Sequence, residues 1–136
     1  MKKVFLIVSL AVMLLSGCSA DEAVTYTSIT ANEAKELMDS RNDYIILDVR
    51  TEKEFSEGHI PGAVLIPDYE IAERAANELP DKDQLILVYC RSGRRSKIAS
   101  EKLAELGYKN VKEFGGIIDW GYDTNIKSTV RLNPRI

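Results

Sequence analysis

The sequence predicts an α/β domain built on a mainly parallel sheet that helices cover on both faces. Short apolar runs bounded by turn residues, which are typical of buried strands, occur several times along the chain. The segments between them have apolar residues at helical spacing, and several begin at a capping residue or end at a glycine or proline. Strands that alternate with helices in this way form parallel sheets, because each parallel connection needs a long crossover.

Two capping boxes mark helix starts in the first half of the chain, at residues 30–33 and 51–54. The first box begins a helix with a one-sided apolar stripe: Ala34, Leu37 and Met38. A strand is predicted at residues 44–49, and the second box begins a short helix directly after it. Residues 60–66 then pass through Pro61-Gly62 into another short strand.

The second half contains the central predicted strand, residues 85–89, which leads into Cys90. A helix over residues 69–79, stopped by Pro80, precedes it, and a helix over residues 96–106 follows. The buried side of the later helix is expected to hold Ala99, Leu103 and Leu106. Gly107 is expected to end that helix as a left-handed cap, with Tyr108 packing back on the last turn. A last strand, residues 111–114, turns at Gly115-Gly116 into a short helix that ends at Trp120, an expected core anchor.

One segment combines the features of a reactive site: Cys90-Arg91-Ser92-Gly93-Arg94-Arg95-Ser96. Backbone N–H groups converge in a loop between a strand and a helix, and the helix N-terminus adds partial positive charge. Three arginines add more, so the pattern favours a thiolate at Cys90 and a nucleophilic role for it. The alternative is a buried strand-end cysteine beside a solvated basic turn, but packing does not explain the arginines and the glycine.

Residues 1–17 are typical of a secretory signal and not of the folded domain. Two lysines precede an apolar stretch, residues 4–15, that is short for a membrane span. It ends in Leu15-Ser16-Gly17-Cys18, which resembles the lipobox of bacterial lipoproteins, where the cysteine is acylated and becomes the first mature residue. We therefore expect a protein tethered through Cys18 to the extracytoplasmic face of a bacterial membrane. An ordinary signal peptide with a coincidental cysteine is the alternative.

After removal of the signal, 119 residues remain, which is one ordinary domain. We assign residues 18–27 to a lipidated N-terminus and flexible tether, residues 28–126 to the domain, and residues 127–136 to a C-terminal extension. The remaining 16 basic and 21 acidic residues give no indication of nucleic-acid binding. With Cys18 lipidated, Cys90 is an unpaired thiol in an exported protein, which indicates a reactive thiol or an intermolecular pair. One histidine and two cysteines do not favour a zinc site, and we expect no metal and no cofactor.

Three separated groups of residues match a known pattern in order. The first comprises Leu47-Asp48-Val49-Arg50, Glu54-Phe55 and Gly58-His59-Ile60-Pro61-Gly62-Ala63; the second is Tyr89 to Ser96; the third is Gly115-Gly116-Ile117-Ile118-Asp119-Trp120. Over about residues 28–122 the chain resembles a rhodanese domain of the single-domain thiosulfate sulfurtransferase family, here on a bacterial lipoprotein. The resemblance implies a rhodanese-like α/β fold with a mainly parallel five-stranded sheet flanked by helices on both faces.

The resemblance also implies the chemistry of Cys90. Its thiolate attacks the outer sulfur of a donor such as thiosulfate, becomes a persulfide, and passes the sulfur to a thiophilic acceptor such as cyanide or a thiol. The implied binding residues are Arg91, Ser92, Gly93, Arg94, Arg95 and Ser96. The loop N–H groups and the Ser96 hydroxyl can surround an anion or the terminal sulfur. Arg91 and Arg95 are the preferred contacts for an anionic donor, because an arginine fork matches oxyanion geometry; solvated surface charges are the alternative.

Loop length distinguishes sulfur transfer from phosphate chemistry. Four residues separate Cys90 from Arg95, whereas related phosphatases and arsenate reductases have five, with arginine as the seventh loop residue. The seventh residue here is Ser96, so the cradle is smaller and suits a sulfur atom.

Three further residues are assigned supporting roles. Asp48 and Arg50 point to one face at a strand end, and we favour hydrogen bonds that tie strand ends to neighbouring loops over a charge near the active-site loop. His59, the only histidine, is interpreted as a structural residue that holds a loop, with a Cys–His dyad as the alternative.

The sequence thus predicts a membrane-anchored extracytoplasmic sulfurtransferase of the thiosulfate:cyanide type. A binding module that uses this fold without turnover, or a redox protein that forms mixed disulfides through Cys90, is the alternative. A phosphatase or arsenate reductase is disfavoured by the loop length.

Overall fold

The structure is a computed structural model that describes residue 23 and residues 25–126. The predicted signal segment, the predicted lipidation site Cys18 and the predicted C-terminal extension lie outside the described residues. Within the described part, no helix is both long enough and apolar enough to cross a membrane.

Five strands form one parallel sheet, as the sequence predicted. In chain order they are β1 (Thr27–Ser28), β2 (Tyr44–Asp48), β4 (Val64–Leu65), β5 (Leu85–Cys90) and β6 (Val111–Gly116). Across the sheet the order is β1-β6-β5-β2-β4, and every neighbouring pair is parallel. Cys90 is the last residue of the central strand β5 and therefore lies at the carboxyl ends of the parallel strands.

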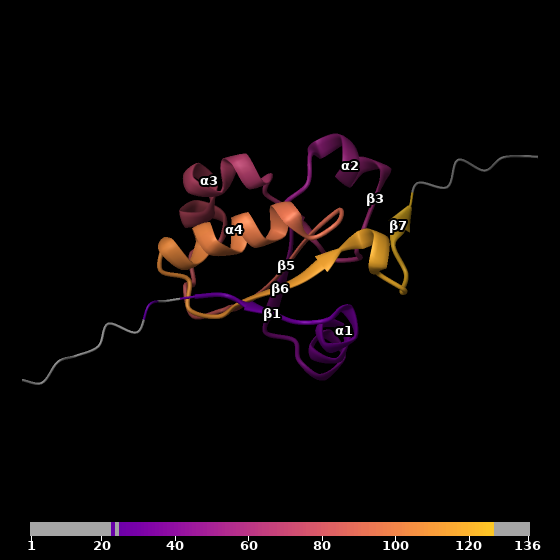
Figure 1. The fold of residues 1–136 in the computed structure, drawn as a ribbon, viewed down its shortest axis with the longest axis horizontal. Helices are drawn as coiled ribbons and strands as arrows, with labels where there is room; N and C mark the ends of the chain where they lie inside the picture. The colour runs from indigo at the N-terminus through magenta and orange to yellow at the C-terminus, as the bar shows by residue number, and fades with distance from the viewer. Residues whose placement is uncertain (1–22, 24, 127–136) are drawn as a thin grey trace, which may run out of the picture.

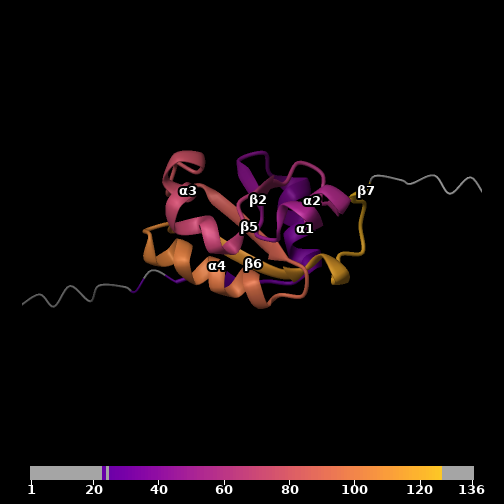
Figure 2. The ribbon, with the colours of Figure 1, turned by 90° about the horizontal axis from the view of Figure 1, so that it is seen from above.

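Helices cover both faces of this sheet (Figures 1 and 2). Helix α1 (Ala31–Ser40) lies on one face, and α3 (Ile71–Glu78) and α4 (Arg94–Glu105) lie on the other. The short helix α2 (Glu52–Glu57) lies near the carboxyl end of the strands. Both predicted capping boxes are present, at the starts of α1 and α2.

Several predicted boundaries differ from the structure. The helix predicted at residues 69–79 divides into a 3₁₀-helix, η1 (Asp68–Glu70), and α3, in line with the frequent use of 3₁₀ turns at helix starts. The strand predicted within residues 60–66 is confined to β4. Gly115 and Gly116 end β6 instead of forming a separate turn, and a second 3₁₀-helix, η2 (Ile117–Asp119), follows them.

Two short pairings were not predicted. Strand β1 includes Thr27, the last residue assigned to the tether, and pairs it with Lys112 of β6. Strands β3 (Gly58–His59) and β7 (Asn125–Ile126) form an antiparallel pair beside the main sheet. Strands of two residues are too short to show an alternating pattern, so sequence periodicity cannot reveal them.

The two faces of β5 belong to two separate hydrophobic clusters. Ile86, Val88 and Cys90 face α3 and α4, whereas Leu85, Leu87 and Tyr89 face α1, because successive strand residues point to opposite faces. Trp120 lies in the second cluster and is 8% exposed, which confirms the expected core anchor. All six residues of β5 are buried, so the Cys90 sulfur rests on a rigid central strand.

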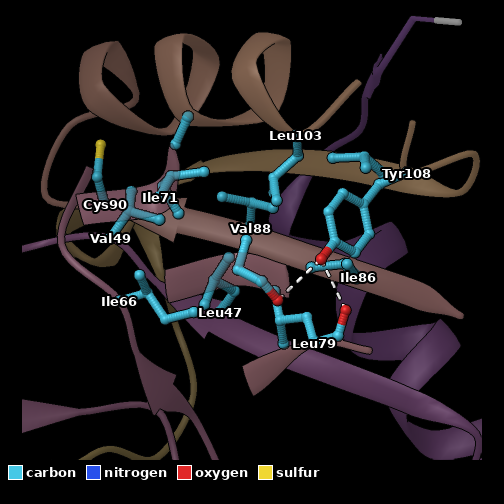
Figure 3. Close-up of a cluster of buried hydrophobic side chains, with 13 residues drawn as sticks. Leu47, Val49, Ile66, Ile71, Leu79, Ile86, Val88, Cys90, Leu103 and Tyr108 are labelled. Atoms are coloured by element: carbon cyan, nitrogen blue, oxygen red, sulfur yellow. Dashed lines mark hydrogen bonds between the residues drawn. The ribbon is translucent and has the colours of Figure 1, made fainter. Parts of the chain in front are cut away.

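The end of α4 connects this helix to α3. Gly107 has φ +92°, and the N–H groups of Gly107 and Tyr108 donate to the carbonyls of Ala104 and Leu103, which is a Schellman motif. The Tyr108 ring enters the core instead of merely covering the last turn. Its hydroxyl lies within hydrogen-bond distance of two carbonyl oxygens, that of Ala75 in α3 at 2.8 Å and that of Leu79 directly after α3 at 2.7 Å. Figure 3 shows Tyr108 at one end of the first cluster and the Cys90 sulfur at the other.

We expect Tyr108→Phe to lower the free energy of unfolding by about 1–3 kcal/mol, because two buried carbonyls lose their hydroxyl partner. The change would be measured by urea unfolding. Tyr44→Phe, which removes a hydroxyl that makes no hydrogen bond within the described residues, is the matched control and should leave stability nearly unchanged. Equal unfolding midpoints for the two variants would contradict this account of the α3–α4 contact.

Candidate active site

Cys90 stands at the junction of β5 and the loop that leads into α4. Residues 91–93 form the loop, and Arg94 begins the helix, two residues before the predicted start. Cys90 is 1% exposed, whereas Arg91 and Ser92 are exposed. The loop therefore covers a buried thiol at the N-terminal end of a helix, as the sequence indicated.

The sulfur of Cys90 is surrounded by hydrogen-bond donors. The Gly93 N–H donates to Sγ at 3.0 Å, and Sγ lies 3.5 Å from the Ser96 Oγ. Burial raises the pKa of Cys90. Hydrogen bonds from the Ser96 side chain and from the N–H groups of Ser96, Gly93 and Ser92 lower this pKa by more than burial raises it. The net effect is a pKa below the ordinary thiol value, which favours the nucleophilic thiolate.

Two glycines shape the loop by different means. Gly93 has φ +101°, a left-handed conformation that favours glycine, and it precedes the first residue of α4. Gly116 is required for space, because a Cβ there would lie 2.0 Å from the Arg91 carbonyl oxygen. The end of β6 thus supports the loop backbone directly, and the Ile118 N–H donates to the same carbonyl at 3.3 Å.

The three arginines of the loop have different surroundings. Arg95 forms a bidentate ion pair with Glu54 of α2, with both N···O distances 2.8 Å. This guanidinium lowers the pKa of Glu54 to about 2. Arg91 and Arg94 are exposed and form no ion pair with any residue that the structure describes. They are the loop cations that remain available to an anionic ligand.

Asp48 and Arg50 form a buried ion pair next to the site. Arg50 donates to both Asp48 oxygens and to the Gly58 carbonyl, the last at 2.7 Å. The Tyr89 hydroxyl also donates to Asp48, at 2.6 Å, and accepts from the Ile60 N–H at 3.1 Å. The network therefore links the ends of strands β2 and β5 to the point where α2 ends and β3 begins, at residues 57–58, which we call the α2–β3 corner. No hydrogen bond in the described structure connects it to Cys90.

His59 lies in the same corner. Its ring stacks on Phe55 with a 3.7 Å centroid separation, and Nδ1 lies 2.9 Å from the Phe55 carbonyl oxygen. Within residues 25–126 the structure shows no hydrogen bond from His59 to Cys90, so the contacts of this histidine are those of the α2–β3 corner.

Three residues with roles in the site were not assigned roles from the sequence. Glu54 was recognised only as a capping residue and part of a motif, and Gly116 only as part of a turn and of the last motif. Glu113 was not singled out, although it is 2% exposed and accepts a hydrogen bond from the Ser96 hydroxyl at 2.7 Å. A signal was available for Glu113: it lies two residues after Val111 on the same strand face, where a buried apolar residue is expected.

A surface cleft of about 400 Å³ opens beside the loop. Its walls include Arg50, Glu54, Arg91, Ile118 and Trp120. Among the described residues there is no group of three or more His, Cys, Asp or Glu side chains placed to hold a metal ion. The cleft places the exposed Arg91 beside apolar side chains, next to the loop that covers the thiol.

Comparisons of this chain with known proteins agree on one family. Residues 30–122 match the model of the rhodanese-like domain. The chain is 42% identical over 73 residues to the thiosulfate sulfurtransferase PspE of Escherichia coli K12, covering 54% of this chain and 70% of that protein. It is 36% identical over 100 residues to the putative sulfurtransferase YtwF of Bacillus subtilis 168, covering 74% and 95%.

Solved structures agree with these relatives. A structure described as a rhodanese with anions from E. coli superposes with a TM-score of 0.56 at 38% identity, covering 60% of this chain and 95% of that one. Some curated relatives are longer, and the chain spans 55% or less of three of them.

We expect the Arg95–Glu54 pair to give the protein a specific acid sensitivity. The folded pKa of Glu54 is about 2, below its ordinary 4.5. The stabilisation is therefore complete above pH 4.5 and is lost as the pH falls towards 2. Glu54→Gln should lower the free energy of unfolding by about 1–3 kcal/mol at neutral pH, the range being reduced because the pair is partly exposed.

Urea unfolding of both proteins between pH 2 and 7 measures this difference. Glu57→Gln, an exposed change on the same helix, serves as the control. A stability gap between wild type and Glu54→Gln that stays constant down to pH 2 would show that the carboxylate does not act through its charge.

Proposed function

The chain belongs to the rhodanese-like family, and we propose that it is a sulfurtransferase that carries sulfane sulfur as a persulfide on Cys90. The observation that carries this proposal is the buried Cys90 thiol, whose pKa is held below its ordinary value by hydrogen bonds from the loop and the start of α4. A relative that shares 42% identity is named a thiosulfate sulfurtransferase, which supports thiosulfate as a donor.

In the proposed first step, the Cys90 thiolate attacks the outer sulfur of thiosulfate. A bond forms between Sγ and that sulfur, and the bond between the two donor sulfurs breaks, with its electron pair leaving on sulfite. In the second step, cyanide or a thiolate attacks the outer persulfide sulfur, and the Cys90 thiolate leaves. The loop N–H groups, such as that of Gly93, stabilise negative charge on sulfur in both steps.

Donor binding is assigned mainly to Arg91, Arg94 and the loop backbone. Arg91 is exposed beside the cleft of about 400 Å³, so its fork is free to meet an oxyanion. Arg95 was a preferred donor contact from the sequence, but both of its terminal nitrogens are bound to Glu54. We therefore propose that Arg95 fixes α2 beside the loop and contributes only its longer-range charge to the site.

The same ion pair supports sulfur transfer over phosphate or arsenate chemistry. A phosphate clamp needs an arginine fork directed at the centre of the loop, whereas the Arg95 fork is directed at Glu54. Together with the short loop, this makes a phosphatase or arsenate reductase the less favoured alternative. A mixed-disulfide function through Cys90 remains as the second candidate, because the thiol is activated whatever its electrophile is.

We also propose that the protein is lipid-anchored through Cys18 at the extracytoplasmic face of a bacterial membrane. The support is the sequence alone: a basic start, an apolar stretch, and Leu15-Ser16-Gly17 before the cysteine. Anchoring there would place the sulfurtransferase domain outside the cytoplasm, where its donor and acceptor would be small molecules of that compartment.

The persulfide is tested by intact mass of the full chain carrying Cys18→Ser, so that Cys90 is the only thiol. After exposure to thiosulfate and desalting without reductant, we expect a gain of one sulfur atom that cyanide removes. The same chain with Cys90→Ser is the control and should show no gain. A thiol that alkylates readily but gains no sulfur would favour the mixed-disulfide alternative.

Lipidation is tested by expressing the natural chain in a bacterium and measuring the intact mass of the membrane fraction. We expect loss of residues 1–17, addition of acyl chains at Cys18, and partition into detergent. Cys18→Ser should remain unacylated. A mature chain that begins at any other residue and carries no acyl group would refute the anchor.

A further inference from the structure

Glu113 is a buried carboxylate that lies beneath the active-site loop without a cationic partner. It is 2% exposed, and none of the ion pairs among the described residues includes it. An unpaired charge is unfavourable in a protein interior unless hydrogen bonds satisfy it. The proposed sulfur transfer assigns no role to this carboxylate. An apolar side chain at this position would avoid the cost of burying a charge.

Three hydrogen-bond donors surround the Glu113 carboxylate. The Ser96 hydroxyl of α4 and the Gly115 N–H donate to Oε1, at 2.7 and 2.8 Å. The Ser28 hydroxyl of β1 donates to Oε2 at 3.1 Å. Residues from three elements therefore converge on one carboxylate, and one of them, Ser96, also contacts the Cys90 sulfur.

The Ser96 hydroxyl has a single proton to donate, and Glu113 and Cys90 are two of the groups that compete for it. The carbonyl oxygens of Gly93 and Gly115 also lie within reach, at 3.0 and 3.4 Å. The distance from Ser96 Oγ is 2.7 Å to Glu113 Oε1 and 3.5 Å to Cys90 Sγ. The short contact to a carboxylate is the stronger hydrogen bond, so the proton lies towards Glu113. The hydrogen bond from the Ser96 hydroxyl to the sulfur is therefore weaker than it would be without Glu113, while the backbone N–H groups of the loop also donate to the sulfur.

We infer that Glu113 is a positioning residue for the Cys90 sulfur, because it draws the Ser96 hydroxyl proton away from the sulfur and places a negative charge on the other side of that hydroxyl. Both effects raise the energy of an anion on sulfur. The thiolate becomes a stronger nucleophile towards the donor and a poorer leaving group when the persulfide gives up its outer sulfur. The part that concerns the persulfide rests on the proposed function, whereas the part that concerns the free thiol does not.

Within the described part of the chain, the charged groups near the sulfur include Arg91 and Arg94, which are exposed, and Arg95. Arg95 of α4 interacts with the Cys90 charge, and it is paired with Glu54 of α2 and influenced by Asp68 of η1. Strand β1 contributes only the Ser28 hydroxyl to Glu113. A substitution at Glu113 therefore changes one charge while this surrounding set stays the same.

The first test is Glu113→Gln in the full chain carrying Cys18→Ser, with the Cys90 thiolate followed by ultraviolet absorbance against pH. The amide oxygen keeps an acceptor for Ser96 and removes the charge. We expect the midpoint to move to lower pH by about two units, the size expected for a unit charge two hydrogen bonds away at an effective dielectric constant of about 20. Glu101→Gln, an exposed change on α4, is the matched control and should leave the midpoint in place. An unchanged or higher midpoint in Glu113→Gln would overturn the inference.

Ser96→Ala gives an independent test that does not depend on how well a variant at Glu113 folds. If the Ser96 proton lies mainly towards Glu113, removal of the hydroxyl takes only a weak donor from the sulfur, and the thiolate midpoint should rise by much less than one pH unit. A rise of about one pH unit would mean that the hydroxyl donates to the thiolate, and would overturn the inference.

The persulfide part is tested by loading each protein with thiosulfate and timing the loss of the added sulfur to cyanide by intact mass. We expect discharge to be several-fold faster in Glu113→Gln than in the parent chain or in Glu101→Gln, because the departing Cys90 thiolate is more stable there. Equal rates would overturn the persulfide part. Failure of the parent chain to gain sulfur would refute the proposed function instead, and the thiolate titration would still decide the role of Glu113.

Discussion

The position of Cys90 depends on the confinement of β5 at the centre of the sheet. Parallel pairing with β2 and β6 fixes this strand on both edges, and the two hydrophobic clusters cover it on both faces. A strand held in this way cannot shift its register by one residue without moving its side chains to opposite faces. The position of the Cys90 thiol relative to α4 is therefore fixed by the strand. Only the backbone of the loop that follows has to adopt a special conformation around the sulfur.

That loop is held from two sides. Behind it, Gly116 approaches the Arg91 carbonyl so closely that any side chain at this position would displace the loop. Beside it, Glu54 binds Arg95, while Arg50 ties the α2–β3 corner to Asp48 at the end of β2. The loop N–H groups are thus oriented before any ligand arrives, which is the condition under which fixed dipoles stabilise charge effectively.

Local signals in the sequence predicted most of the fold. The capping boxes at residues 30–33 and 51–54 and the left-handed Gly107 depend on residues close in the chain, and all three were predicted correctly. The pairing of β3 with β7 and the hydrogen bonds of Tyr108 to α3 join segments far apart in the chain, so no local pattern contains them. The same limit explains why the Cys90 loop was recognised while the Glu54 partner of Arg95 was not.

The arrangement of charge suggests that this site is built to exchange an anion and not to hold it tightly. Three arginines follow the cysteine closely in the sequence, yet one is neutralised by Glu54 and the other two are exposed to solvent. On the other side of the Ser96 hydroxyl from the sulfur lies a carboxylate, Glu113. A sulfur anion is stabilised by the Ser96 hydroxyl and by backbone N–H groups such as that of Gly93, which together lower the pKa of Cys90. In the proposed reaction the same sulfur must be charged and discharged in every cycle, and a site that bound its persulfide anion with three free guanidinium groups would retain it. The hydrogen-bond donors stabilise the Cys90 thiolate when it leaves the persulfide, and the carboxylate keeps the same thiolate nucleophilic towards the donor, so that neither step is slowed to the sole benefit of the other.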